Sequence, residues 1–106
     1  VPLTGLHWII DHAETISPRS IARIAAMDGG IAIQHRMAFQ GEYFLNRYGA
    51  DAAAEAPPIR RILGAGVPLG AGTDATRVAS YNPFVSLYWL VSGRTAGGTA
   101  LYPARN

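Results

Sequence analysis

From residue 70 the chain reads Gly70-Ala71-Gly72-Thr73-Asp74-Ala75-Thr76. The preceding residues Val67 and Leu69 add apolar side chains, and the alternating glycines let neighbouring backbone approach closely. This pattern predicts a short, tightly packed strand that stops at the carboxylate of Asp74, with hydroxyl groups beside it at Thr73 and Thr76. In a parallel α/β barrel the chemistry is placed at the carboxyl ends of the strands. Asp74 is therefore the first candidate for a functional residue.

Two earlier stretches have the same form, an apolar run that ends in polar residues. They are Ile9-Ile10-Asp11-His12 and Ile31-Ala32-Ile33-Gln34-His35. A helix is predicted between each pair of consecutive strands. These helices begin at Ser17-Pro18 and Pro57-Pro58, since proline is favoured at the first position of a helix. The resulting strand–helix–strand order predicts an α/β fold with a parallel sheet. Because three strands leave open sheet edges, we expect the chain to be a slice of something larger.

The remaining elements are predicted from weaker patterns. Residues 6–11 form a nearly continuous apolar run, which favours a strand buried on both faces. Residues 36–56 predict a long connection with a short helical segment over 41–48, which the alanine-rich residues 51–55 could extend. Asn82-Pro83 predicts the start of a helix that is apolar on more than one side and therefore packed. The glycine-rich residues 93–106 predict a tail or a severed connection.

Composition bounds the class of protein. The chain of 106 residues is long enough for one domain, which we take as 1–106, and it is 49% hydrophobic but only 15% charged. So low a charged fraction indicates that much of the surface is covered by more chain or by a partner, and we expect a homo-oligomer. The first residues carry no positively charged region and no initiator Met, which fits processing or a piece of a longer chain.

Charge and cysteine content exclude several partners. All nine basic residues are arginines, and they are scattered rather than gathered in the basic stripe that nucleic-acid binding needs. No run of about 18 apolar residues predicts a membrane span. The absence of cysteine removes disulfides and thiolate metal sites and is compatible with a cytoplasmic protein. Any metal must therefore be held by histidine and carboxylate.

His12 and Asp74 are the candidates for that role, since neutral imidazole and carboxylate are good zinc ligands and a bound ion activates water. The alternative is that Asp74 caps a turn and His12 is a satisfied strand-end histidine. Asp11 is either a residue that orients a metal-binding histidine or an ordinary turn residue. Gln34 and His35 are candidates for substrate contact, although adjacent strand residues point in opposite directions. We interpret Glu14 as an ordinary acid of a first helical turn.

Several stretches taken together resemble one family. They are Ile10-Asp11-His12-Ala13-Glu14, Ile31-Ala32-Ile33-Gln34-His35, the run from Gly66 to Ala75, and Asn82-Pro83. Their order is similar to that in the metal-dependent amidohydrolase superfamily. The closest resemblance is to its type 3 branch, which includes enzymes like N-substituted formamide deformylase and N-acyl amino acid deacylase. It covers about residues 6–95, and the Gly72-Thr73-Asp74-Ala75 ending is its most specific part.

The resemblance implies a (β/α)8 TIM barrel, of which this chain would supply strands six to eight in the C-terminal part. On that template His12 is a metal ligand and Asp74 is both metal ligand and general base. Asp11 stands where the branch often has Glu, and Gln34 and His35 match a substrate-side position. The implied activity is hydrolysis of an amide or other non-peptide C–N bond in a small molecule by water on a divalent metal, with zinc expected.

The family's paired histidines of strand one, its bridging lysine or acid and its strand-five histidine have no counterpart in this sequence. We therefore expect the isolated chain to be inactive. One alternative is a non-catalytic α/β domain that serves packing or oligomerisation. Another is a small ligand-binding module with a phosphate at a helix start, but Asp74 would repel phosphate and no Gly-x-Gly-x-x-Gly follows a strand.

Overall fold

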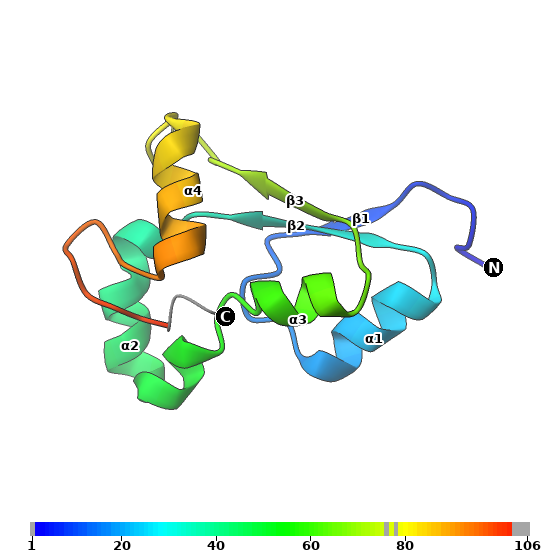
Figure 1. The fold of residues 1–106 in the computed structure, drawn as a ribbon, viewed down its shortest axis with the longest axis horizontal. Coiled ribbons are helices and arrows are strands. Elements are labelled where there is room, and N and C mark those ends of the chain that lie inside the picture. Colours follow the sequence, from blue (N-terminus) through cyan, green and yellow to red (C-terminus); the bar gives the residue numbers. More distant parts are fainter. Residues whose placement is uncertain (1, 76, 78, 103–106) are drawn as a thin grey trace.

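The computed structural model describes residues 2–75, 77 and 79–102, so Thr76 lies outside the described residues. Strands and helices alternate along most of the chain, as Figure 1 shows. The elements are β1 (Ile9–Asp11), α1 (Pro18–Ala26), β2 (Gly30–Gln34), α2 (Met37–Ala54), α3 (Ile59–Gly64), β3 (Leu69–Gly72) and α4 (Pro83–Ser92).

The three strands form one parallel sheet in the order β1-β2-β3. Ile31 of the central strand pairs with Ile10 on one side and with Leu69 on the other. The predicted α/β fold with a parallel sheet is confirmed, and its βα order is consistent with part of a TIM barrel. Because the strands are parallel, their carboxyl ends meet at one edge of the sheet, the edge toward α2 and α4 in Figure 1.

One face of the sheet is covered by α1 and α3 (Figure 1). The apolar side chains on this face form a closed cluster, in which Ile31 and Ile33 of β2 meet Ile21 and Ile24 of α1 and Ile62 of α3. Full burial of a side chain of this size stabilises the fold by about 1.5–3 kcal/mol. The two crossover helices are therefore fixed on the sheet by β2.

The edge strand β1 differs from its prediction. It spans three residues, and all three are exposed among the described residues; the exposed fraction of Ile9 is 63%. The expectation of a strand over 6–11 buried on both faces is wrong for the described structure, because α1 and α3 cover only one face. Parallel pairing puts Ile9, Asp11, Ala32 and Gln34 on the opposite face, which no described helix covers.

Two predicted helix starts are confirmed. The hydroxyl oxygen of Ser17 accepts a hydrogen bond from the Ser20 N–H, and proline occupies the first position of α1. The side-chain oxygen of Asn82 accepts one from the Phe84 N–H at the start of α4. Each cap satisfies a backbone donor that the helix itself leaves without a partner.

Helix α2 is much longer than the predicted segment over 41–48. It runs from Met37 to Ala54 and contains one non-helical residue, Gly49, with φ 85°. Gly49 only kinks the helix, because the alanine-rich residues after it resume the helix, as the sequence allowed, and bury Ala53 against Trp89 and its neighbours. The connection after β2 is thus an ordered helical layer.

The residues after α4 also differ from their prediction as a tail. The described part folds back, with Arg94 and Ala100 bridged in antiparallel fashion and with Leu101 and Tyr102 buried. Tyr102 packs edge-on against Trp89, with ring centroids 5.1 Å apart, and its hydroxyl donates to the carbonyl oxygens of Trp89 and Leu90. This segment joins α2 and α4 into a second apolar cluster.

Helix α4 is packed on one side only. Ser86 and Trp89 are buried, so the prediction of a packed helix holds for one side of α4 among the described residues and is wrong for its other apolar side. The large apolar side chains on its outer side are exposed, namely Phe84, Leu87, Tyr88 and Val91. None of the described helices is long and apolar enough to span a membrane.

Candidate functional site

His12 and Asp74 lie at the same edge of the sheet, immediately beyond β1 and close after β3. The Nε2 atom of His12 is 4.0 Å from Oδ2 of Asp74, although 62 positions separate them in the chain. Both side chains remain open to water, with 47% and 37% of their surface exposed. The parallel sheet therefore brings together the two residues that the sequence singled out as metal ligands.

Both residues have left-handed backbone conformations, with φ of 57° at His12 and 50° at Asp74. Residues other than glycine rarely adopt positive φ, and such strain gathers at functional sites. The sharp turn lets each side chain leave the plane of its strand and face the other across the strand ends. Neither conformation is visible in the sequence, where both positions read as ordinary strand-end polar residues.

Glu14 closes the other side of His12. Its Oε1 is 3.7 Å from Nδ1 of His12 and accepts a hydrogen bond from the Gln34 N–H at 3.3 Å. A carboxylate beside Nδ1 favours the imidazole tautomer with its proton there, which leaves Nε2 free to bind toward Asp74. The expectation of an ordinary first-turn acid is wrong, because α1 begins only at Pro18 and Glu14 instead ties β1 to β2.

Asp11 supports the site through the backbone. Its Oδ1 accepts hydrogen bonds from the His12 N–H and from Nε2 of Gln34, both at 3.0 Å. Asp11 thus holds the turn that aims His12, and does not contact the imidazole ring through a described hydrogen bond. The Gln34 side chain occupies space that Gly72 leaves open, since a Cβ at that glycine would collide with Oε1 of Gln34.

His35 points away from this group, as the alternation of strand side chains predicts. It is 1% exposed, its Nδ1 is hydrogen-bonded to the Ser86 hydroxyl of α4, and its ring packs edge-on against Phe39 at 5.4 Å. Burial lowers the pKa of His35, and the nearby charge of Asp74 opposes that shift only in part. A neutral, enclosed imidazole in this position has no open path to a substrate.

Two buried polar atoms in this region have no hydrogen-bond partner among the described residues. They are Oε1 of Gln34 and Nε2 of His35. Burying a polar group without a partner is costly, and both atoms are enclosed by the surrounding residues. Sequence reasoning had no signal for the partner role of Ser86, which lies in the middle of an apolar helix.

The residues at the strand ends fit part of a metal site. Tetrahedral ligands about 2.0–2.2 Å from one ion lie about 3.4 Å apart. The 4.0 Å spacing of His12 and Asp74 therefore admits an ion after a small inward movement. Within the part of the chain that the structure describes, no group of three or more possible ligands gathers to complete the site. A metal site built on His12 and Asp74 would therefore need at least one further ligand.

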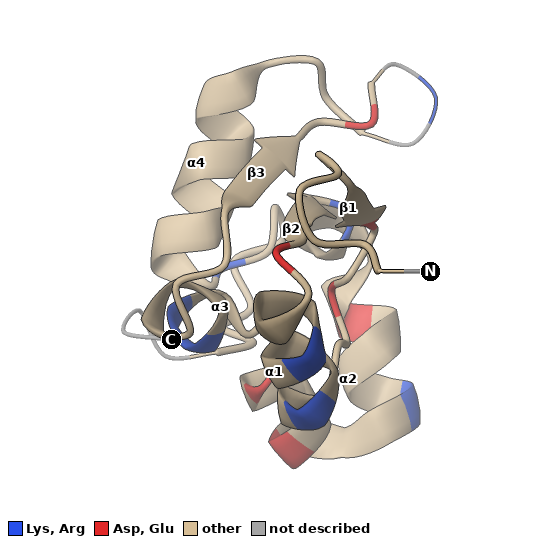
Figure 2. Ribbon diagram, turned by 90° about the vertical axis from the view of Figure 1, so that its right-hand side faces the viewer, with Lys and Arg blue, Asp and Glu red and all other residues tan. Residues whose placement is uncertain are grey.

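The basic residues lie on several helices and follow no single stripe (Figure 2). This distribution matches the scatter of arginines in the sequence. The positive charge is therefore spread over separate points, one of which is Arg36, two residues after the end of β2.

Comparison with known proteins points to a family. The model of a family described as the Amidohydrolase family matches residues 1–106. No match was found among curated proteins or among solved structures. The matched region includes both strand-end residues that face each other and the helices that position them.

Proposed function

Because the chain belongs to the amidohydrolase family, we propose that its strand-end group is half of the catalytic site of a metal-dependent hydrolase. The substrate would be a small molecule with an amide or other non-peptide C–N bond, and the metal would be zinc. The observation that carries the proposal is the approach of His12 Nε2 to Asp74 Oδ2 at 4.0 Å, with both residues in left-handed turns.

In this proposal His12 and Asp74 would hold the ion, which when bound lowers the pKa of a water molecule to about 7. Asp74 accepts the proton from the attacking water and passes it to the leaving nitrogen. Its second carboxylate oxygen makes this double duty possible. Glu14 and Asp11 keep His12 in its tautomer and orientation, and the Gln34 side chain supports the site through its hydrogen bond to Asp11.

The isolated chain would be inactive, because ligands beyond the described residues are required. Association with further copies or with more polypeptide would supply them, and we keep homo-oligomerisation and a cytoplasmic location as part of this proposal. The second candidate is a non-catalytic packing or oligomerisation domain. The exposed apolar side of α4 favours it, since Phe84 and Val91 are exposed by 74% and 68%.

The deciding experiment is titration of the purified protein with zinc, followed through the histidine ring resonances and by metal content against solution mass. We expect zinc to shift the ring signals of His12, and Asp74→Asn to weaken this binding by about tenfold or more. His7→Ala is the matched control, because His7 is exposed and lies outside β1. Zinc that leaves His12 unperturbed, or that binds equally well in Asp74→Asn, would contradict the proposed metal site.

Activity is measured separately. If the purified 106-residue chain hydrolyses an amide and loses this activity in Asp74→Asn, the assignment of Asp74 stands and the expected inactivity of the isolated chain is wrong. If zinc is not bound and Asp74→Asn changes nothing, the packing domain is the better account.

A further inference from the structure

A groove runs along α2 beside the carboxyl ends of β1 and β2. It consists of two neighbouring hollows, of about 260 and 450 Å³, which share Arg36, Met37, Phe44 and Tyr48 as lining residues. The larger hollow also touches Glu14, whose carboxylate lies 3.7 Å from the His12 ring. The groove therefore opens directly next to the strand-end group.

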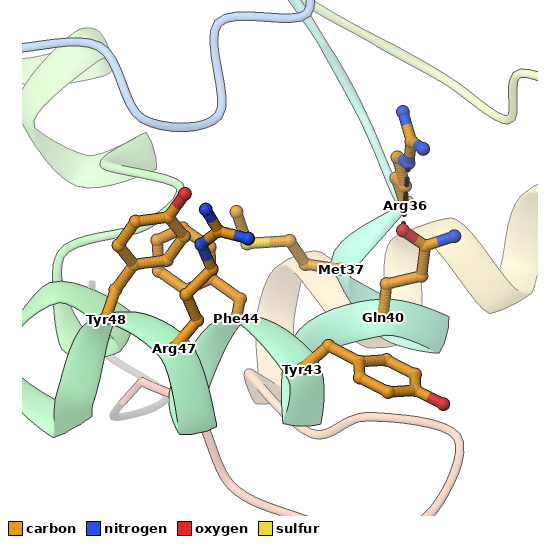
Figure 3. A pocket seen from close by; sticks show the side chains of 7 residues that line it. All are labelled: Arg36, Met37, Gln40, Tyr43, Phe44, Arg47 and Tyr48. Carbon is orange, nitrogen blue, oxygen red and sulfur yellow. Dashed lines mark hydrogen bonds between the residues drawn. The ribbon is translucent and has the colours of Figure 1, made fainter.

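The floor of the groove is apolar and aromatic. Met37 is buried, and the rings of Phe44 and Tyr48 lie 4.8 Å apart at an angle of 43°. Figure 3 shows the Met37 side chain extending toward these two rings, while Tyr43 points in the opposite direction. The three side chains make a flat surface on which an aromatic or aliphatic group can pack.

Two guanidinium groups border this floor. Arg36 donates from Nε to Oε1 of Gln40 at 3.2 Å, and Arg47 lies 5.5 Å from the centre of the Tyr48 ring. Neither arginine makes an ion pair with a carboxylate among the residues that the structure describes. Each guanidinium carries five N–H donors, so most of the donors of Arg36 and Arg47 remain available to a ligand.

The positions of the charges favour one class of ligand. Arg36 and Arg47 are 11 residues apart, which places them on a similar face of α2 and about 16 Å apart along its axis. Met37, Phe44 and Tyr48 lie between or beside them (Figure 3). Glu14 lines only the larger hollow and repels an anion there, so the anionic part of a ligand is directed to the smaller hollow, which both Arg36 and Arg47 line.

We propose that this groove binds an organic carboxylate with an aromatic or apolar body. The carboxylate pairs with Arg36 or Arg47, which match its planar geometry, and the body packs on Met37, Phe44 and Tyr48. That this ligand is the substrate of the neighbouring site rests on the proposed function. The preference for a carboxylate over its neutral counterpart does not.

The test compares 3-phenylpropanoate with its neutral amide, 3-phenylpropanamide, by NMR titration of the full chain without metal. We expect the acid to bind about tenfold more tightly, a difference of about 1.4 kcal/mol. We also expect that Arg36→Met, Arg47→Met or both reduce acid binding about fivefold or more while leaving amide binding unchanged. Methionine keeps the length of the aliphatic stem. Arg19→Met, at an exposed position of α1 outside the groove, is the control.

Equal binding of acid and amide would overturn the proposal, as would acid binding that survives both arginine substitutions. Absence of binding of either compound up to about 10 mM would also overturn it. The two proposals fail separately. A chain that binds the acid but no zinc keeps the groove and loses the hydrolytic site, whereas zinc binding at His12 without acid binding removes only the groove.

Discussion

Replacing Ser86 by alanine tests whether the buried contact between α4 and β2 holds this end of the molecule together. Ser86 and His35 are both buried, and the serine hydroxyl is the described hydrogen-bond partner of Nδ1 of His35. Nε2 of the same ring already has no partner among the described residues. Removing the hydroxyl leaves the imidazole without a described hydrogen bond at either nitrogen.

The loss of this hydrogen bond sets the expected decrease in stability. Leaving a buried donor or acceptor unsatisfied costs about 1–3 kcal/mol. In a chain of this size each kcal/mol lowers the melting temperature by about 4–8 °C. We therefore expect Ser86→Ala to lower it by roughly 5–20 °C in thermal unfolding followed by circular dichroism. Ser92→Ala, at the end of the same helix, is the control, because its hydroxyl only accepts from the exposed Arg94 N–H.

A double substitution separates the hydrogen bond from simple loss of volume. His35→Leu combined with Ser86→Ala removes both polar partners, and such paired replacements are close to neutral. We expect the double variant to recover most of the stability that Ser86→Ala loses. A loss in Ser86→Ala no larger than in Ser92→Ala would refute the reasoning, because the contact would then contribute nothing.

The same pair predicts a dependence of stability on pH. Burial lowers the pKa of His35 below its usual value of 6.5. Above pH 6.5 the ring is neutral in both states, whereas below it the unfolded chain takes up a proton that the folded chain resists. Stability is therefore full at neutral pH and falls as the pH drops below 6.5. His35→Leu should remove this component from unfolding curves recorded between pH 7.5 and about 5.

Three further changes test other parts of the structure. Gly93→Ala should lower the free energy of unfolding, measured with urea, by about 1–3 kcal/mol, because φ at Gly93 is 65° and a Cβ would collide with the Tyr102 carbonyl oxygen. Gly64→Ala is the opposite case, because the space around Gly64 is open, and it should stabilise the fold by about 0.4–1 kcal/mol. Burial raises the pKa of Tyr102, so Tyr102→Phe should leave the alkaline absorbance titration below about pH 11 unchanged, and an altered curve would place this hydroxyl in water. Asp74→Asn should change the free energy of unfolding by less than about 0.5 kcal/mol, because its side chain is partly exposed; a loss above about 1 kcal/mol would make Asp74 a structural cap.

The parts of the fold that the sequence predicted are those set by local chemistry. Ser17 with Pro18 and Asn82 with Pro83 mark helix starts through hydrogen bonds within one turn, so neighbouring residues suffice to predict them. Helix α2 was underestimated because Gly49 is a stop signal locally, while burial of Ala53 against residues far along the chain carries the helix past it. The role of the last described residues depends likewise on contacts of Tyr102 with α4.

The sequence identified which residues lie at the candidate site, but not the backbone conformation and contacts that orient them. Polar residues at strand ends identify His12 and Asp74, since parallel strands end at one edge. Their positive φ values and the contact of Glu14 with the imidazole arise only when the strands pair. His35 was paired with Gln34 as a substrate residue; the alternation along the strand turns it the other way, and its partner on that side, Ser86 of α4, lies about fifty residues later in the chain.

The arrangement of His12 and Asp74 is held by the backbone rather than by their mutual attraction. Two unit charges 4 Å apart in water interact by only about 1 kcal/mol, before screening by salt. An exposed pair of this kind does not fix its own geometry. The Asp11 carboxylate holds the turn at His12, and β2 fixes the register of both outer strands. A site prepared in this way costs little to reorganise when a ligand arrives, which is what a group that must hold an ion and move a proton requires.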